Sequence, residues 1–161
     1  MWLGTITLLF ILTASKASPL QNIISEYNVP DVIRKCVETL GNGYLISGKI
    51  NPFYLSVDYD GDGNADFAVL IKRGEQQGIA ICPTGRASPT ILGAGTEFHQ
   101  MRDLDFDAWQ LHPKNRRVER GADESPPPRL QGDAIHVVWE ERASAILYWN
   151  GRSFAWYQQG D

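Results

Sequence analysis

The feature that most constrains the fold of this chain is a series of short strand-like segments that follows Gly43. Each segment is rich in β-branched or aromatic residues and is bounded by Gly, Pro, Asn or Asp, which is typical of antiparallel strands. The last three segments give the clearest signal, because Asn150-Gly151 supplies the positive φ angles that a two-residue hairpin turn requires. The expected strands cover 44–50, 53–57, 67–72, 78–82, 89–92, 134–140, 143–149 and 153–158.

Residues 20–40 have helical rather than strand-like periodicity. Their apolar residues form two short stripes at helical spacing, over 20–27 and 32–40, and Gly41 can end the second helix in a left-handed conformation. We therefore expect an α+β fold, with an N-terminal helix or helices packed on an antiparallel β meander of roughly seven to nine strands. This fold would form a single domain over residues 18–161.

Two further segments are expected at the surface. Acidic and apolar residues alternate strictly over 103–107, which predicts an exposed strand. The run Ser125-Pro126-Pro127-Pro128 fits neither a helix interior nor a central strand, so 112–131 is predicted to be a long surface loop. A basic cluster in this loop is interpreted as a solvated surface rather than a phosphate-binding patch. It consists of Lys114, Arg116, Arg117 and Arg120.

Residues 1–17 have the pattern of a signal peptide. An uncharged apolar run ends in small residues, and cleavage after Ala17 would leave Ser15 and Ala17 where a signal peptidase needs them. The alternative, an amphipathic first helix, lacks a polar face, and the run is shorter than the about 20 residues of a transmembrane helix. Loss of Lys16 would shift the net charge from −4 to −5, which disfavours a nucleic-acid partner. We expect a periplasmic or secreted protein.

The chain has two cysteines, Cys36 and Cys82, and both lie after the expected cleavage position. In an exported protein an even number of cysteines permits a disulfide. Two buried thiols that never meet are the alternative. The sequence favours the bridge slightly and leaves both possibilities open, because geometry decides whether the bond forms.

Residues 57–67 carry the clearest chemical signal. Three aspartates occupy alternate positions, a glycine follows the third, and a fourth aspartate stands three residues later. Such alternation turns every second side chain toward one point, and Ca²⁺ accepts about six to eight oxygen ligands. A solvated turn of Asp and Gly is the alternative, but it would not need acids at this spacing. The predicted calcium ligands are the carboxylates of Asp58, Asp60, Asp62 and Asp66 and the main-chain carbonyl of Asn64.

This segment resembles the calcium loop shared by EF-hands, dockerins and the FG-GAP/VCBS-type repeats of β-propellers. It departs from the EF-hand at the twelfth loop position, which is Val69 instead of a bidentate Glu, and in its strand-like flanks. It is therefore more similar to the FG-GAP/VCBS type, in which the ninth-position acid, here Asp66, completes the metal shell within a β-hairpin, here about 53–72. The resemblance implies a site and not a whole fold, and small secreted bacterial proteins of unknown role carry such a hairpin.

Three functions remain open from the sequence. We favour an exported, non-catalytic calcium-binding protein that engages another protein, such as an inhibitor or immunity protein acting on a toxin or hydrolase. The second is a carbohydrate-binding or envelope-associated module that binds a cell-wall glycan, suggested by five tryptophans. The third is a hydrolase with an unrecognised site near His99 and 103–107. His99, His112 and His136 lack the spacing of a zinc site, and no Gly-x-Ser-x-Gly turn is present, so an enzyme is the less favoured class.

Three of the tryptophans fall one on each of the last three expected strands. Trp139, Trp149 and Trp156 are thus placed for cross-strand aromatic packing. We interpret them as part of the core rather than as a sugar-binding platform.

Overall fold

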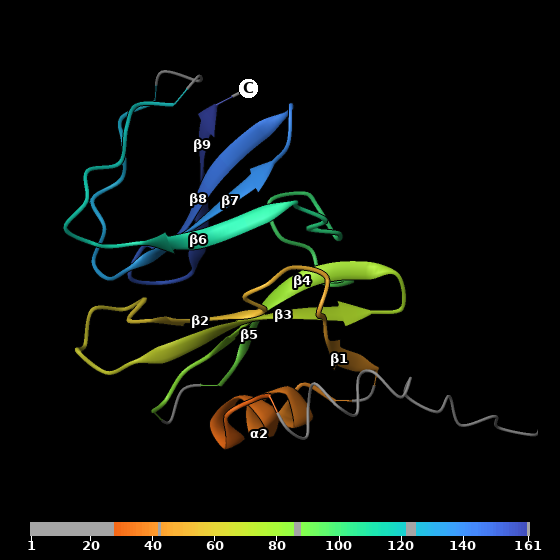
Figure 1. Cartoon of the computed structure of the whole chain (residues 1–161). Helices are drawn as coiled ribbons and strands as arrows, with labels where there is room; N and C mark the ends of the chain where they lie inside the picture. Colours follow the sequence, from red (N-terminus) through yellow and green to blue (C-terminus); the bar gives the residue numbers. More distant parts are fainter. Residues whose placement is uncertain (1–27, 42, 86–87, 122–124, 161) are drawn as a thin grey trace, which may run out of the picture.

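The computed structural model shows two antiparallel β-sheets that lie face to face, with a helix on the outer side of the first sheet (Figure 1). The expected signal peptide, 1–17, and the first predicted helical stripe, 20–27, lie outside the described residues. The structure describes residues 28–41, 43–85, 88–121 and 125–160.

The first sheet has five strands centred on β3 (Asp66–Arg73). On one side of β3, β4 (Gln76–Cys82) and β5 (Thr90–Gly93) follow as successive antiparallel neighbours. On the other side, β1 (Tyr44–Ile46) pairs with the end of β3 and β2 (Tyr54–Val57) pairs with its beginning. The hairpin predicted over about 53–72 is therefore the β2–β3 pair.

The second sheet is a four-stranded antiparallel meander. Its strands are β6 (Ala108–His112), β7 (Ala134–Trp139), β8 (Ala143–Trp149) and β9 (Phe154–Gly160), in that spatial order. The last three match the predicted strands closely, because short turns such as Asn150-Gly151 mark their ends in the sequence. The sequence analysis did not predict β6.

The two central strands of the first sheet are buried on both faces. In β3, Ala68 and Leu70 pack into the core between the sheets, while Val69 and Ile71 pack beneath the helix. Successive side chains of a strand point to opposite faces, so a strand covered on both sides reads as a continuous apolar run. The central core joins this inner face to residues of the second sheet, including Ile135, Val137, Ala145 and Leu147.

Helix α2 (Asp31–Thr39) covers the outer face of the first sheet. Ile33 and Val37 are its buried residues, and they join the apolar cluster on that face. Cys36 of the helix forms a disulfide with Cys82 at the end of β4, with a Cα–Cα distance of 5.8 Å. The possible bridge is thus confirmed, and it fastens the helix to the sheet.

The expectation of an α+β fold is wrong, because the described chain is mainly β. It contains nine strands and one helix of nine residues. The predicted helical pattern is correct over 31–39, but helices do not form the main second layer. A second β-sheet covers the inner face of the first, since the meander predicted from the hairpin turns divides into two sheets between β5 and β6 (Figure 1).

The prediction of an exposed strand at 103–107 is also wrong. The segment is irregular and links the two sheets, and its apolar residues Leu104 and Phe106 lie in the central core with 1% and 2% exposure. The alternation of polar and apolar residues reflects burial of every second side chain without strand pairing. In so short a segment, a periodicity of two does not distinguish a paired strand from an irregular segment that buries every second side chain.

The predicted surface loop corresponds to the connection 113–133 between β6 and β7. Its described residues run along the outer face of the second sheet, and two of them, Val118 and Leu130, pack there with Ile146 and Tyr157. The loop therefore supplies the apolar cover for a sheet face that no helix of the described chain protects.

Candidate metal centre

The predicted metal site lies in the loop between β2 and β3. The register pairs Val57 with Asp66, so these two residues close the loop at its base. Gly61 and Gly63 have φ angles of +79° and +89°, which side-chain-bearing residues rarely adopt. The two glycines thus allow the sharp bends that fold the acidic side chains back on one another.

Three of the predicted ligands converge. One carboxylate oxygen from each of Asp58, Asp60 and Asp66 lies within 4.8 Å of the others. In the described part of the chain this is the one group of three or more His, Cys, Asp or Glu side chains arranged to hold a metal ion. The three acids differ in burial, since Asp66 is only 4% exposed whereas Asp58 and Asp60 are more accessible.

Asp58 also organises the loop around itself. Its Oδ1 accepts a hydrogen bond from the Gly61 amide at 2.8 Å, and its Oδ2 accepts one from the Gly63 amide at 3.1 Å. The Nζ atom of Lys114 approaches Oδ2 at 3.6 Å. These donors hold the carboxylate at the centre of the loop and partly offset its negative charge.

Asp66 is the buried member of the group. Its Oδ1 accepts hydrogen bonds from the amide and the hydroxyl of Thr84, at 2.8 Å and 3.3 Å. Burial raises the pKa of Asp66, its hydrogen bonds with Thr84 act in the opposite direction, and the nearby charges of Asp60 and Asp62 raise it further. The loop therefore places a carboxylate where a negative charge is costly unless a cation accompanies it.

Asp62 and Asn64, the other two predicted ligands, are arranged differently. The carboxylate of Asp62 accepts hydrogen bonds from the amide and the side chain of Asn64, at 2.7 Å and 2.9 Å. These bonds, with the side-chain contact as the largest contribution, lower the pKa of Asp62. Asp62 is exposed and is not part of the converging group.

The loop contacts the second sheet through the residues just before β7. The amide of Asp133 donates to the carbonyl of Asp58 at 2.6 Å, and its carboxylate accepts from the amides of Asp58 and Lys114, at 3.4 Å and 2.9 Å. A Cβ atom on Gly61 or Gly132 would overlap backbone of the facing segment. The acidic loop between β2 and β3 and the entry to β7 thus meet backbone to backbone, a contact the sequence did not reveal.

This close approach makes Gly132 sensitive to substitution. Gly132→Ala should lower the free energy of unfolding by about 2 kcal/mol, because the added methyl overlaps the carbonyls of Asp58 and Tyr59 and overpacking typically costs 1–3 kcal/mol. Gly85→Ala is a matched control, since its Cβ would meet nothing within 4 Å. Chemical denaturation of both variants measures the difference. Equal stability of the two would contradict a tight contact at Gly132.

An aromatic residue of the loop anchors it to the central core. Tyr59 is 8% exposed, and its ring lies 5.7 Å from that of Trp149 and 5.2 Å from that of Phe154. Burial, followed by the charges of Asp66, Asp60 and Asp62, raises the pKa of Tyr59 to about 12. The sequence analysis did not assign Tyr59 a role, although its position between two predicted ligands was visible.

The tryptophans of the second sheet pack against the central core. Trp139, Trp149 and Trp156 are partly buried there, and the rings of Trp139 and Trp156 lie 5.5 Å apart. The ring of His99 stacks on Trp156 at 4.9 Å. This packing supports the interpretation of the aromatic set as core.

The acids of 103–107, considered for catalysis, serve separate structural contacts. Asp103 accepts a hydrogen bond from the Gln77 amide and Asp107 from the Glu140 amide, each at 2.8 Å, while Asp105 pairs with Lys49. None of the three belongs to the converging carboxylate group.

Comparisons with known proteins identify no relative of this chain: it matches no family model, no curated protein and no solved structure. The resemblance of the loop to FG-GAP/VCBS-type repeats therefore stays a prediction. In the described residues, no helix has the length and apolar character needed to cross a membrane.

Proposed function

We propose that this is an exported calcium-binding protein in which the ion fastens the β2–β3 loop, and with it the contact between the two sheets. The observation that carries the proposal is the convergence of Asp58, Asp60 and Asp66 carboxylate oxygens within 4.8 Å. Three like charges at this separation repel one another, and a bound divalent cation turns that repulsion into attraction.

Calcium suits this group better than softer metals. The three side chains offer only carboxylate oxygens, which favour Ca²⁺, Mg²⁺ or Mn²⁺ over metals that prefer nitrogen or sulfur. The loop is open on the side of Asp62, which is exposed, so water and further oxygens can complete a large coordination shell. Ca²⁺ tolerates such irregular shells, whereas Mg²⁺ requires near-octahedral geometry. Rotation of the Asp62 side chain would add a fourth carboxylate.

The position of the loop gives the ion a structural role. Asp58 belongs both to the converging group and to the contact with Asp133 at the entry to β7. A cation that immobilises Asp58 would therefore also stabilise the junction of the two sheets. The Cys36–Cys82 disulfide supports export, since such bonds persist in oxidising, extracellular environments.

We further propose that the protein acts by binding a partner protein rather than by catalysis. The acids of 103–107, the candidates for catalysis, support this because each makes a structural contact: two accept hydrogen bonds from main-chain amides, and the third forms an ion pair with a lysine. A carbohydrate-binding role has no comparable support, because the three tryptophans are partly buried against the core.

Isothermal titration tests the metal proposal directly. Chelator-treated protein should bind one Ca²⁺ per chain, and Mg²⁺ should bind more weakly because of its geometric demands. Chains in which Asp105, outside the loop, is replaced by Asn should give the same isotherm. Absence of Ca²⁺ binding at millimolar concentration would overturn the proposal, and tighter binding of Mg²⁺ would overturn the choice of metal.

A further inference from the structure

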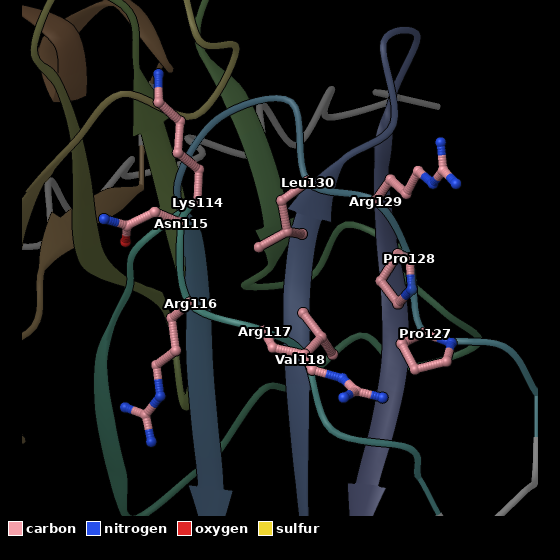
Figure 2. Close-up of a pocket in the computed structure, with 9 residues that line it drawn as sticks. All are labelled: Lys114, Asn115, Arg116, Arg117, Val118, Pro127, Pro128, Arg129 and Leu130. Atoms are coloured by element: carbon pink, nitrogen blue, oxygen red, sulfur yellow. The ribbon is translucent and has the colours of Figure 1, made fainter.

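The connection between β6 and β7 forms a basic hollow on the outer side of the second sheet. The hollow has a volume of about 420 Å³ and lies between two limbs of the connection, 114–118 and 127–130. Figure 2 shows the side chains of Val118, on the first limb, and Leu130, on the second, in the space between the limbs, with the side chains of Arg116 and Arg129 reaching out on opposite sides.

The lining is cationic in a protein of net negative charge. Lys114, Arg116, Arg117 and Arg129 line the hollow and no acidic residue among those the structure describes does, although the whole chain carries a net charge of −4. Lys114 pairs with Asp58 at 3.6 Å. In the described part of the chain, the three arginines have no carboxylate partner. Their exposed guanidinium groups are therefore available to an anion, and this group suits bidentate contact with a carboxylate.

The two limbs are held in place by the sheet beneath them. The hydroxyl of Tyr157 in β9 donates a hydrogen bond to the Ser125 carbonyl at 2.8 Å and accepts one from the Gly121 amide at 3.0 Å. On the first limb, the His112 ring nitrogen Nε2 lies 3.1 Å from the Arg116 carbonyl, and Val118 is buried on the sheet. A hollow fixed in this way loses little conformational entropy when a ligand binds.

The floor of the hollow is apolar. Pro127, Pro128 and Leu130 are half-buried and Val118 is buried, while the arginines at the rim are exposed. This combination suits a ligand that carries both carboxylates and short apolar side chains. A long polyanion fits less well, because Lys114 at one end of the hollow is paired with Asp58. A polyanion extending past Lys114 would be repelled by the carboxylates of the acidic loop.

We propose that this hollow is the docking site for an acidic segment of a partner protein, with Arg116, Arg117 and Arg129 binding its carboxylates. The inference rests on the proposed role in partner binding and does not depend on the calcium site. It revises the interpretation of the basic cluster as merely solvated. Arg120, the fourth residue of that cluster, does not line the hollow, whereas Arg129, distant in sequence, does.

A short fluorescent peptide of alternating Glu and Leu provides the test. Fluorescence anisotropy should show binding to the wild-type protein that weakens with salt, and no binding of the matching Lys–Leu peptide. The triple variant Arg116→Gln, Arg117→Gln, Arg129→Gln should weaken binding about tenfold or more, because three exposed ion pairs are lost together. The variant Arg102→Gln, Arg142→Gln, Arg152→Gln changes the charge equally outside the hollow and should bind like the wild type.

Three results would overturn the docking site: no peptide binding, equal weakening by both triple variants, or stronger competition by a sulfated oligosaccharide or inorganic phosphate than by unlabelled peptide. A cooperative thermal melt of each variant, measured in parallel with its calcium response, verifies that it is folded. An intact calcium response without peptide binding removes the docking site and leaves the metal proposal standing. Peptide binding without a calcium response removes the metal proposal and leaves the docking site standing.

Discussion

Calcium at a hundredfold excess over its dissociation constant should increase the free energy of unfolding by about 2.7 kcal/mol, because it binds the native state alone. For a chain of this size, that corresponds to a rise in melting temperature of about 8 °C, taking roughly 3 °C per kcal/mol. The converging carboxylates of Asp58, Asp60 and Asp66 are separated in the unfolded chain, so the unfolded state lacks the site. Thermal melts in calcium and in chelator measure the shift.

Asp60→Asn should abolish this response. Asp60 accepts fewer hydrogen bonds than Asp58 or Asp66. Its carboxylate accepts one, from the Asp62 amide at 3.1 Å. In chelator the variant should melt above the wild type, because the charge of Asp60 acts against the ionised form of the buried Asp66. A variant that is more stable without calcium and insensitive to it distinguishes a metal ligand from a structural acid.

Two further variants complete the comparison. Asp105→Asn removes an acid whose side chain is exposed and paired with Lys49, so the calcium response should be unchanged. Asp62→Ala should weaken calcium binding by a smaller factor than Asp60→Asn, since Asp62 must turn away from Asn64 to reach the ion. If the melting temperature of the wild type is the same in calcium and in chelator, the metal proposal is wrong and the loop is a solvated turn.

Replacing both Cys36 and Cys82 by Ser should cost about 4 kcal/mol of stability. The bond joins residues separated by 46 positions, and in the entropy model closing a loop of this length removes conformational entropy from the unfolded chain and raises its free energy by that amount. Helix α2 should be the element most affected, because the bond ties it to the end of β4. Denaturant unfolding of the variant and the oxidised wild type measures the difference.

The wild type under reducing conditions serves as the control for this variant. Its stability should fall to that of the double serine variant, since both lack the same cross-link. The calcium response should survive in both. The disulfide fastens α2 to the outer face of the first sheet, whereas the converging carboxylates belong to the loop between β2 and β3. A loss below about 1 kcal/mol would contradict the expected contribution.

Local sequence patterns predicted the hairpins well. The segments 53–57, 67–72, 78–82, 134–140, 143–149 and 153–158 all lie in observed strands or extend one residue beyond them, since turn residues and β-branched runs act over a few neighbours. The same patterns failed at 103–107 and missed β6, whose five residues include both Trp109, buried in the core, and the exposed Gln110. Short mixed segments depend on what packs against them.

The candidate site was also only partly visible in the sequence. The spacing of the aspartates predicted the group, and three of the four converge. The hydrogen bonds from Thr84 to Asp66 and the contact of Asp133 with Asp58 join residues distant in sequence. No local pattern encodes such pairs.

The sequence by itself determined most of the strands and their turns, the helix at 31–39 and the acidic loop, because these follow from periodicity and residue type within a few positions. The tertiary structure alone decided that the strands divide into two facing sheets, that Cys36 meets Cys82, and that Arg129 joins Arg116 and Arg117 around one hollow. These arrangements depend on burying apolar faces against one another, and the partner of each face is selected by the whole chain.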